Sequence, residues 1–289
     1  AGERACEALA TRRDAPAITR ETARRNGVHY TRQAAELFGA ALLVRIGVDV
    51  APPFHAFNPS LADGDGSLRT IVRLANYQVV NGVYEIGDDA GIVRTRNLLG
   101  CVSAEGVMTD VRELALAEAA RQPPLFASRW SGFEDCRLFA WRDRLWCTAT
   151  VRDRDPSMRC QIVLMALAGD GSIVSVDVLH GPEPHLHQKN WLPFIHADAL
   201  HFIYRSDPTT VLRYNDKTRD VDCVFREDAP RAFDHLRGGA SPVTFDDGWL
   251  YVAHESVDIE GRGRCYSNRF VHLNAGFSVA AVTRPFYFT

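Results

Sequence analysis

The chain has 289 residues, of which 46% are hydrophobic and 24% charged, a composition typical of a globular protein with ample material for a core. The formal net charge of −3 provides no basic field of the kind that holds nucleic acid. No apolar run reaches the length of a membrane span, because Arg45 interrupts the stretch from Leu42 to Val50. We therefore expect no nucleic-acid partner and no membrane span, and the scattered cysteines described next favour a cytoplasmic protein.

The seven cysteines are scattered and none falls in a Cys-x-x-Cys pair, so we expect reduced thiols. His185 and His187 are the only close histidine pair, and in their Pro-rich loop a hydrogen-bonded turn is a simpler interpretation than a metal site. No metal or organic cofactor is implied. The chain begins with Ala1-Gly2-Glu3 and not with Met, which indicates processing or an origin in a longer multidomain chain.

Residues 1–50 differ in composition from the rest and are rich in Ala, Arg and Glu up to about residue 46. Apolar residues between Ala34 and Leu42 recur at helical spacing. This pattern predicts a helical N-terminal segment of two or three helices, with Thr31 or Asn26 as starting residues.

Residues 51–289 alternate short runs rich in Val, Ile, Phe, Tyr and Trp with turns of Gly, Asp, Asn and Pro, which predicts an all-β domain. One phrase, a turn with Asp or Gly followed by a strand and a polar residue, occurs four times. Its copies span Asp65–Arg73, Arg142–Thr150, Ala197–Arg205 and Asp246–His254. The later copies are about 50 residues apart, a period typical of β-propeller blades, and about five blades fit this length. A pair of β-sandwiches is the alternative, but it would not explain the repeat.

Val111–Arg121 has the pattern of a helix of about three turns, ended by Pro123-Pro124. We expect this helix as an insertion between two blades.

A polar cluster stands roughly ten residues before each copy of the phrase. The four clusters begin at Phe57, Gly132, Gln188 and Arg237. Because the innermost strands of a propeller line a central channel, these clusters are expected to converge there. Convergence of Asn58, Arg73, Asp135, Arg137, Lys189 and Asn190 would form a cationic pocket around one acid, which suits a sugar that carries or meets a phosphate.

The same clusters resemble those of the inverting β-mannoside phosphorylases and mannosidases, a family of five-bladed propellers, and of the related propeller mannosyltransferases. The resemblance rests on four elements in the same order over residues 54–289. These are Asn58-Pro59, the Gly-x-Glu-Asp-x-Arg element at Gly132–Arg137, Lys189-Asn190, and the region from Gly238 to His254.

The resemblance implies an enzyme that acts on mannosides or related sugars, with Asp135 as general acid and inorganic phosphate, a sugar phosphate or a nucleotide sugar as co-substrate. It implies that Arg73, Lys189, His254 and Tyr266 hold the phosphate, with Arg269 as a weaker candidate. The full set of expected substrate or phosphate ligands is Asn58, Ser60, Arg73, Asn76, Glu134, Arg137, Lys189, Asn190, His254, Tyr266 and Arg269.

Two alternatives stay open. An inverting hydrolase would need a second carboxylate about 6.5–9.5 Å from the acid, for which Glu255 and Asp258 are candidates. A non-catalytic propeller would have no need of Arg73 and Lys189 beside Asp135 if it binds carbohydrate, and would expose apolar patches on its faces if it binds a protein partner. Departures from the family pattern, such as Cys136 where the phosphorylases usually carry Pro, leave the sugar and the reaction open.

Overall fold

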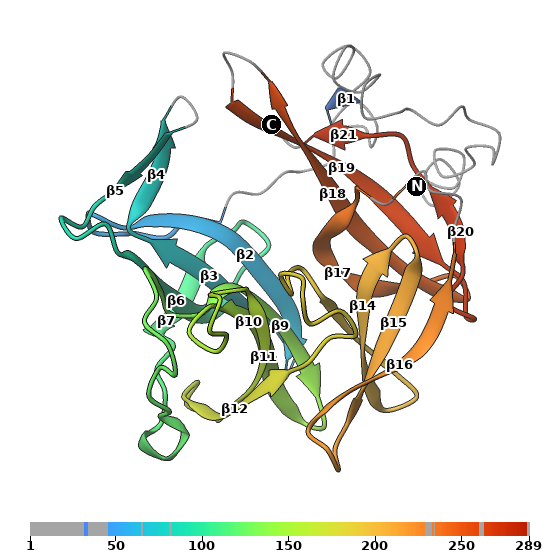
Figure 1. The fold of residues 1–289 in the computed structure, drawn as a ribbon, viewed down its shortest axis with the longest axis horizontal. Helices are drawn as coiled ribbons and strands as arrows, with labels where there is room; N and C mark the ends of the chain where they lie inside the picture. Colours follow the sequence, from blue (N-terminus) through green and yellow to red (C-terminus); the bar gives the residue numbers. More distant parts are fainter. Residues whose placement is uncertain are drawn as a thin grey trace.

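The protein is all-β, as the sequence predicts, and its sheets follow one another in chain order around a common centre (Figure 1). This computed structural model describes residues 32–33, 46–64, 66–80, 83–228, 233, 235–259 and 263–287. In these ranges the only helical element is a single 3-10 turn, η1 (Glu118–Ala120), and no helix is long and apolar enough to span a membrane.

Four sheets form blades of a β-propeller. The first is β2 (His55–Gly64), β3 (Ser67–Ala75), β6 (Val93–Val102) and β7 (Met108–Glu113), with β8 (Trp130–Ser131) parallel to β6. The second is β9 (Glu134–Trp141), β10 (Arg144–Val151), β11 (Gln161–Leu167) and β12 (Ile173–Leu179). The third is β13 (Leu192–His196), β14 (Ala199–Ser206), β15 (Thr209–Asn215) and β16 (Asp220–Glu227). The fourth is β17 (Arg237–Phe245), β18 (Gly248–Ile259), β19 (Gly263–Leu273) and β20 (Val279–Val282), joined by β21 (Phe286–Tyr287) and β1 (Arg32–Gln33).

Each copy of the recurring phrase covers the start of the second strand of a blade, namely β3, β10, β14 and β18, which confirms that interpretation of the repeat. The turns before these strands explain the Asp or Gly in the phrase. Arg142 and Asp143 both have positive φ, as do Ala197 and Asp198. Two-residue hairpins of this geometry match the right-handed twist of the strands that they join, and Asp and Gly tolerate the left-handed backbone.

Apolar clusters join each blade to the next. Ile71 and Leu99 of the first blade pack with Leu138 and Val163 of the second. A second cluster of buried residues, which includes Trp191 and Phe202, joins blades two and three, and a third joins blades three and four. Face-to-face packing of sheets that follow one another in the chain holds the propeller together, because each sheet covers the apolar face of its neighbour.

The sequence predicts about five blades, whereas the described residues form four. The first spacing of the repeat is longer than the others because it contains insertions and not a further blade. The hairpin of β4 (Tyr77–Val80) and β5 (Val83–Ile86) projects from the first blade, and an irregular segment follows β7 (Figure 1). The predicted N-terminal helices lie mostly outside the described residues; the described pair Arg32–Gln33 is a strand.

The predicted helix over Val111–Arg121 is wrong. Its first residues end β7, and only η1 near its end is helical. Leu114 and Leu116 both pack against the core between the first two blades. The backbone is extended there, since the Ile173 amide donates to the Ala115 carbonyl and the Ala117 amide donates to the Ile173 carbonyl. Pairing with the second blade therefore overrides the local helical preference.

Candidate functional site

The innermost strands of the blades are distorted at the predicted clusters. In the first blade, Asn58 has a φ of 41° and lies at a register shift between β2 and β3. In the second, Asp135 has a φ of 53° and lies at a register shift between β9 and β10. Bulges of this kind bend a strand and redirect a side chain, and they are common beside active sites. Asn190, shortly before β13, also has a positive φ of 60°, and the fourth blade has its register shift next to Gly238.

Three contacts fix the acidic element between the first two blades. Gly132 has a φ of 94° and packs so closely against the Thr95 carbonyl that a β-carbon would not fit. The Asn97 side chain donates a hydrogen bond to the Phe133 carbonyl at 2.9 Å. Ser60 of β2 accepts a hydrogen bond from the Leu138 amide at 2.9 Å. Ser60 thus joins the two innermost strands, and the residues on either side of Glu134 and Asp135 are held by the first blade.

Arg73 connects the two acids. Its Nη1 lies 2.5 Å from Asp135 Oδ1 and 3.5 Å from Glu134 Oε1, and its Nη2 donates to the Tyr77 hydroxyl at 2.7 Å. Asn58 donates a second hydrogen bond, of 2.8 Å, to Asp135 Oδ1. Burial disfavours the charge of Arg73, which is only 4% exposed, but Asp135, Tyr77 and Glu134 outweigh that effect and raise its pKa. The guanidinium is therefore a permanent cation between two carboxylates.

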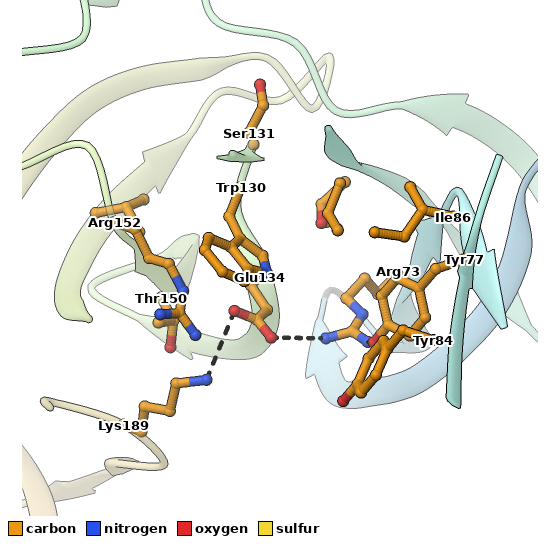
Figure 2. A pocket seen from close by; sticks show the side chains of 14 residues that line it. Arg73, Tyr77, Tyr84, Ile86, Trp130, Ser131, Glu134, Thr150, Arg152 and Lys189 are labelled. Carbon is orange, nitrogen blue, oxygen red and sulfur yellow. Dashed lines mark hydrogen bonds and ion pairs between the residues drawn. The ribbon is translucent and has the colours of Figure 1, made fainter. Parts of the chain in front are cut away.

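Glu134 faces a pocket of about 450 Å³ that lies between the β4–β5 hairpin, β8 and the end of β10 (Figure 2). Lys189, shortly before β13, reaches Glu134 Oε2 at 3.7 Å from the side opposite to Arg73. The lining includes Arg73, Tyr77, Tyr84, Trp130, Arg152 and Lys189. Asp135 does not line this pocket. The consecutive acids thus face different surroundings, and Arg73 contacts both.

Arg137 and His254 lie close to Asp135 and do not line the pocket that Glu134 faces. Arg137 donates hydrogen bonds to the Gly238 and Gly239 carbonyls of the fourth blade and so does not pair with Glu134. Burial lowers the pKa of Arg137 to about 10, against the attraction of Asp135, so the group stays charged at neutral pH. Burial, followed by repulsion from Arg137 and Arg237, lowers the pKa of His254, while Asp135 opposes this change.

The structure places other predicted ligands in supporting positions. Asn76 donates to the Ile92 carbonyl at 3.0 Å and accepts from the Arg94 amide at 2.6 Å, so its side chain closes the loop after the hairpin. Tyr266 is 56% exposed, with its ring 5.9 Å from that of His254.

Arg269 lies in a separate cluster around Glu255. Arg269 is 3.7 Å from Glu255 Oε1, Ser267 donates to the same oxygen at 2.7 Å, and His235 lies 2.7 Å from Oε2. Burial alone would raise the pKa of Glu255, but hydrogen bonds from His235 and Ser267 and the charge of Arg269 lower it to about 2. Of the two predicted base candidates, Glu255 is thus held as an anion, and the Asp258 side chain lies outside the described atoms.

The sequence reasoning missed the aromatic and cationic walls of the pocket, namely Tyr77, Tyr84, Trp130 and Arg152. Tyr77 directly follows the Arg73–Asn76 stretch, and Trp130 stands two residues before Gly132. Their closeness to predicted site residues is the signal that could have found them. No group of three or more potential metal ligands occurs in the described part of the chain, and His187 accepts a hydrogen bond from the Cys160 amide at 3.0 Å.

No protein-family model matches the sequence, and no curated protein matches it. Among solved structures, a candidate glycoside hydrolase from Parabacteroides distasonis ATCC 8503 is similar with a TM-score of 0.55 and 12% identity, over 80% of this chain and 73% of that chain. A candidate glycosidase from Bacteroides thetaiotaomicron VPI-5482 has a TM-score of 0.54 and 14% identity, over 81% and 74%. A mannose phosphorylase from Leishmania mexicana, in complex with phosphate ion, has a TM-score of 0.50 and 12% identity, over 84% and 71%. At these identities the likeness shows a shared fold, and the chain therefore has the β-propeller architecture of these proteins.

Proposed function

We propose that this protein is a carbohydrate-active enzyme, an inverting glycoside phosphorylase or glycosyltransferase that acts on mannosides or related sugars with Asp135 as general acid. The single observation that carries the proposal is one carboxyl group held beside two arginines, Arg73 of the first blade and Arg137 of the second, with His254 of the fourth blade near it. Arg73 contacts it directly, and Arg137 and His254 lie close enough to alter its electrostatic surroundings and to be altered by it. The fold shared with glycosidases and a mannose phosphorylase supports the same class of substrate.

The Asp135 carboxyl is positioned for directed proton transfer. Arg73 and Asn58 both donate to Oδ1, which fixes the rotation of the group. No donor among the described residues bonds Oδ2, and the side chain is 27% exposed. One oxygen is therefore anchored while the other is open to a ligand, the arrangement that a general acid requires.

Phosphate fits the reaction because a nucleophile that is already anionic needs no base. In the degradative direction, a phosphate oxygen would form a bond to the anomeric carbon as the glycosidic carbon–oxygen bond breaks on the opposite face. The proton from Asp135 would pass to the leaving oxygen, directly or through a sugar hydroxyl. Arg73 and Lys189, with His254 and Tyr266, would supply donors for the phosphate oxygens.

Hydrolysis is less well supported, because it requires a second carboxylate that takes a proton from water. Glu255 is a poor base at neutral pH, since its pKa is about 2 and each of its oxygens already has partners. Glu134 is likewise paired, with Lys189 and Arg73 on its two sides.

A panel of sugar 1-phosphates and nucleotide sugars as donors, with acceptor sugars and release of phosphate or nucleotide followed, would test the proposal. Asp135→Asn should abolish turnover and leave sugar binding largely intact, because the amide keeps the size of the group and cannot supply the proton. Asp216→Asn is the matched control, since Asp216 forms an exposed ion pair with Arg142 away from the site. Full activity of Asp135→Asn would show that the assigned acid is wrong. Binding of sugars without turnover on any donor would favour a non-catalytic carbohydrate-binding propeller.

A further inference from the structure

The pocket beside Glu134 has the size and walls of a sugar site. Its volume of about 450 Å³ falls in the range of small-molecule pockets. Tyr84 of the hairpin is 60% exposed and Trp130 of β8 is 41% exposed, and both line the pocket. Exposed aromatic side chains on two walls suit the apolar face of a pyranose ring, while Glu134 offers an acceptor for its hydroxyls.

The pocket also contains a cation, Arg152, that has no counter-charge among the described residues. Arg73 is neutralised by Asp135 and Lys189 faces Glu134, whereas Arg152 forms no ion pair or hydrogen bond with any described residue. Its guanidinium lies over the Trp130 ring at 4.4 Å from the centroid. Nε of Arg152 is buried without a partner among the described residues, and the two Nη groups are the donors that remain for a carboxylate or phosphate oxygen.

The positive field extends to the adjacent loop. Burial and then the charges of Arg152 and Lys189 lower the pKa of His187. Glu134 is the only acid among the pocket-lining residues, against three cations, Arg73, Arg152 and Lys189. A half-buried cation without a counter-charge is unfavourable, so an anionic ligand would relieve it.

Figure 2 shows Arg152 on one side of Glu134, with Arg73 and Tyr84 on the other. Because Arg73 Nη1 contacts both carboxylates, the pocket adjoins the Asp135 carboxyl without including it. A ligand that fills the pocket would thus lie next to the reacting group, as the ring linked to a reacting sugar must.

We infer that this pocket binds a sugar ring that carries one anionic substituent, a carboxylate or a phosphate, with Arg152 bound to the anion and Trp130 stacked near the ring. This inference rests on the proposed function, in which the ring is the acceptor or leaving-group sugar. It adds a charged substrate class and assigns the role to Arg152.

Binding is measured by calorimetry with two matched pairs of probes, methyl glucuronide against methyl glucoside and mannose 6-phosphate against mannose. Wild-type protein should bind at least one anionic probe about ten- to a hundredfold more tightly than its neutral partner, as expected for a charge-assisted hydrogen bond. The pair that shows the preference identifies the anion. Arg152→Gln should remove the preference and leave the affinity for neutral sugar unchanged.

Arg142→Gln is the matched control. Arg142 also lies over a tryptophan, at 4.1 Å from the Trp141 ring centroid, but it is paired with Asp216, so its loss should not alter the preference. Thermal unfolding of each variant confirms that it is folded. Equal affinity of wild type for charged and neutral probes, absence of binding for both pairs, or a preference that survives in Arg152→Gln would overturn the inference.

The outcome is separable from that of the catalytic proposal, because the assay measures binding and not turnover. Asp135→Asn should keep the anionic preference. If the protein prefers the anionic probe but turns over no donor, the proposed function is refuted and the subsite is retained. If it turns over neutral sugars but does not prefer the anionic probe, the subsite is refuted and the proposed function is retained.

Discussion

Glu255 gives the sharpest test of the electrostatics, through the dependence of stability on pH. Its pKa is about 2 in the folded protein and 4.5 as the ordinary value, and its side chain is only 11% exposed. Because the folded-state pKa is the lower one, ionised Glu255 stabilises the fold at any pH above about 4.5, and this contribution is lost as the pH falls towards 2. At about 1.4 kcal/mol per pKa unit, the full contribution is about 3 kcal/mol.

Acidification from pH 7 to pH 3 should remove about 2 kcal/mol of that contribution. The variant Glu255→Gln lacks the titrating group and lacks this part of the pH dependence. We therefore expect the difference in unfolding free energy between wild type and variant, measured by urea denaturation, to shrink by about 2 kcal/mol over this range.

Glu118→Gln serves as the control, because Glu118 is 85% exposed in its pair with Arg121 and should lose no pH-dependent stability relative to wild type. If wild type and Glu255→Gln lost stability in parallel between pH 7 and pH 3, the assigned anionic cluster would be wrong. The same variant bears on the reaction. It should retain turnover per folded molecule, and an abolished rate would point to Glu255 as a base and hence to hydrolysis.

Two further predictions concern how the acidic element is held. Gly132→Ala should lower the unfolding free energy by about 1–3 kcal/mol, because its φ of 94° is unfavourable for alanine and the Thr95 carbonyl occupies the space of the new methyl group. Gly47→Ala is the control, because the space around Gly47 is open. An unchanged melting temperature for Gly132→Ala would contradict the geometry. Arg137→Met should cost about 1.5–3 kcal/mol in chemical denaturation, because it leaves the Gly238 and Gly239 carbonyls without their charged donor, whereas equal stability of variant and wild type would show that these bonds do not couple the second and fourth blades.

The strands were predictable because their signals are local. A turn that needs positive φ selects Asp or Gly, and the strand after it needs β-branched and aromatic residues. The turn before β10 or β14 and the strand itself can therefore be recognised without knowledge of the neighbouring strands. The helix prediction was wrong from Leu114 to Leu116 for the opposite reason. Its conformation is decided by Ile173, more than fifty residues away, and no local pattern contains that pairing.

The candidate site was predictable in part for a similar reason. Asn58, Asp135 and Lys189 each stand at a fixed distance before a recognisable strand, so the repeat brings them together once the fold is assumed. The pocket could not be found in this way, because Tyr84 and Trp130 belong to insertions that the repeat does not describe. The role of Asn76 is also non-local, since its partners lie beyond the β4–β5 hairpin.

In the bulged inner strands, the residues that pack the sheets and the residues that form the candidate site are different residues. Residues such as Leu138 and Val163 satisfy the sheet packing and leave little freedom for change, whereas Asn58 and Asp135 stand where the ladder is interrupted. A residue at such an interruption is left outside the ladder, so its side chain does not have to fit the packing between the sheets. The side chains at these interruptions can therefore differ from one protein to another while the blades stay the same, which accounts for a fold that is shared at identities near 12%.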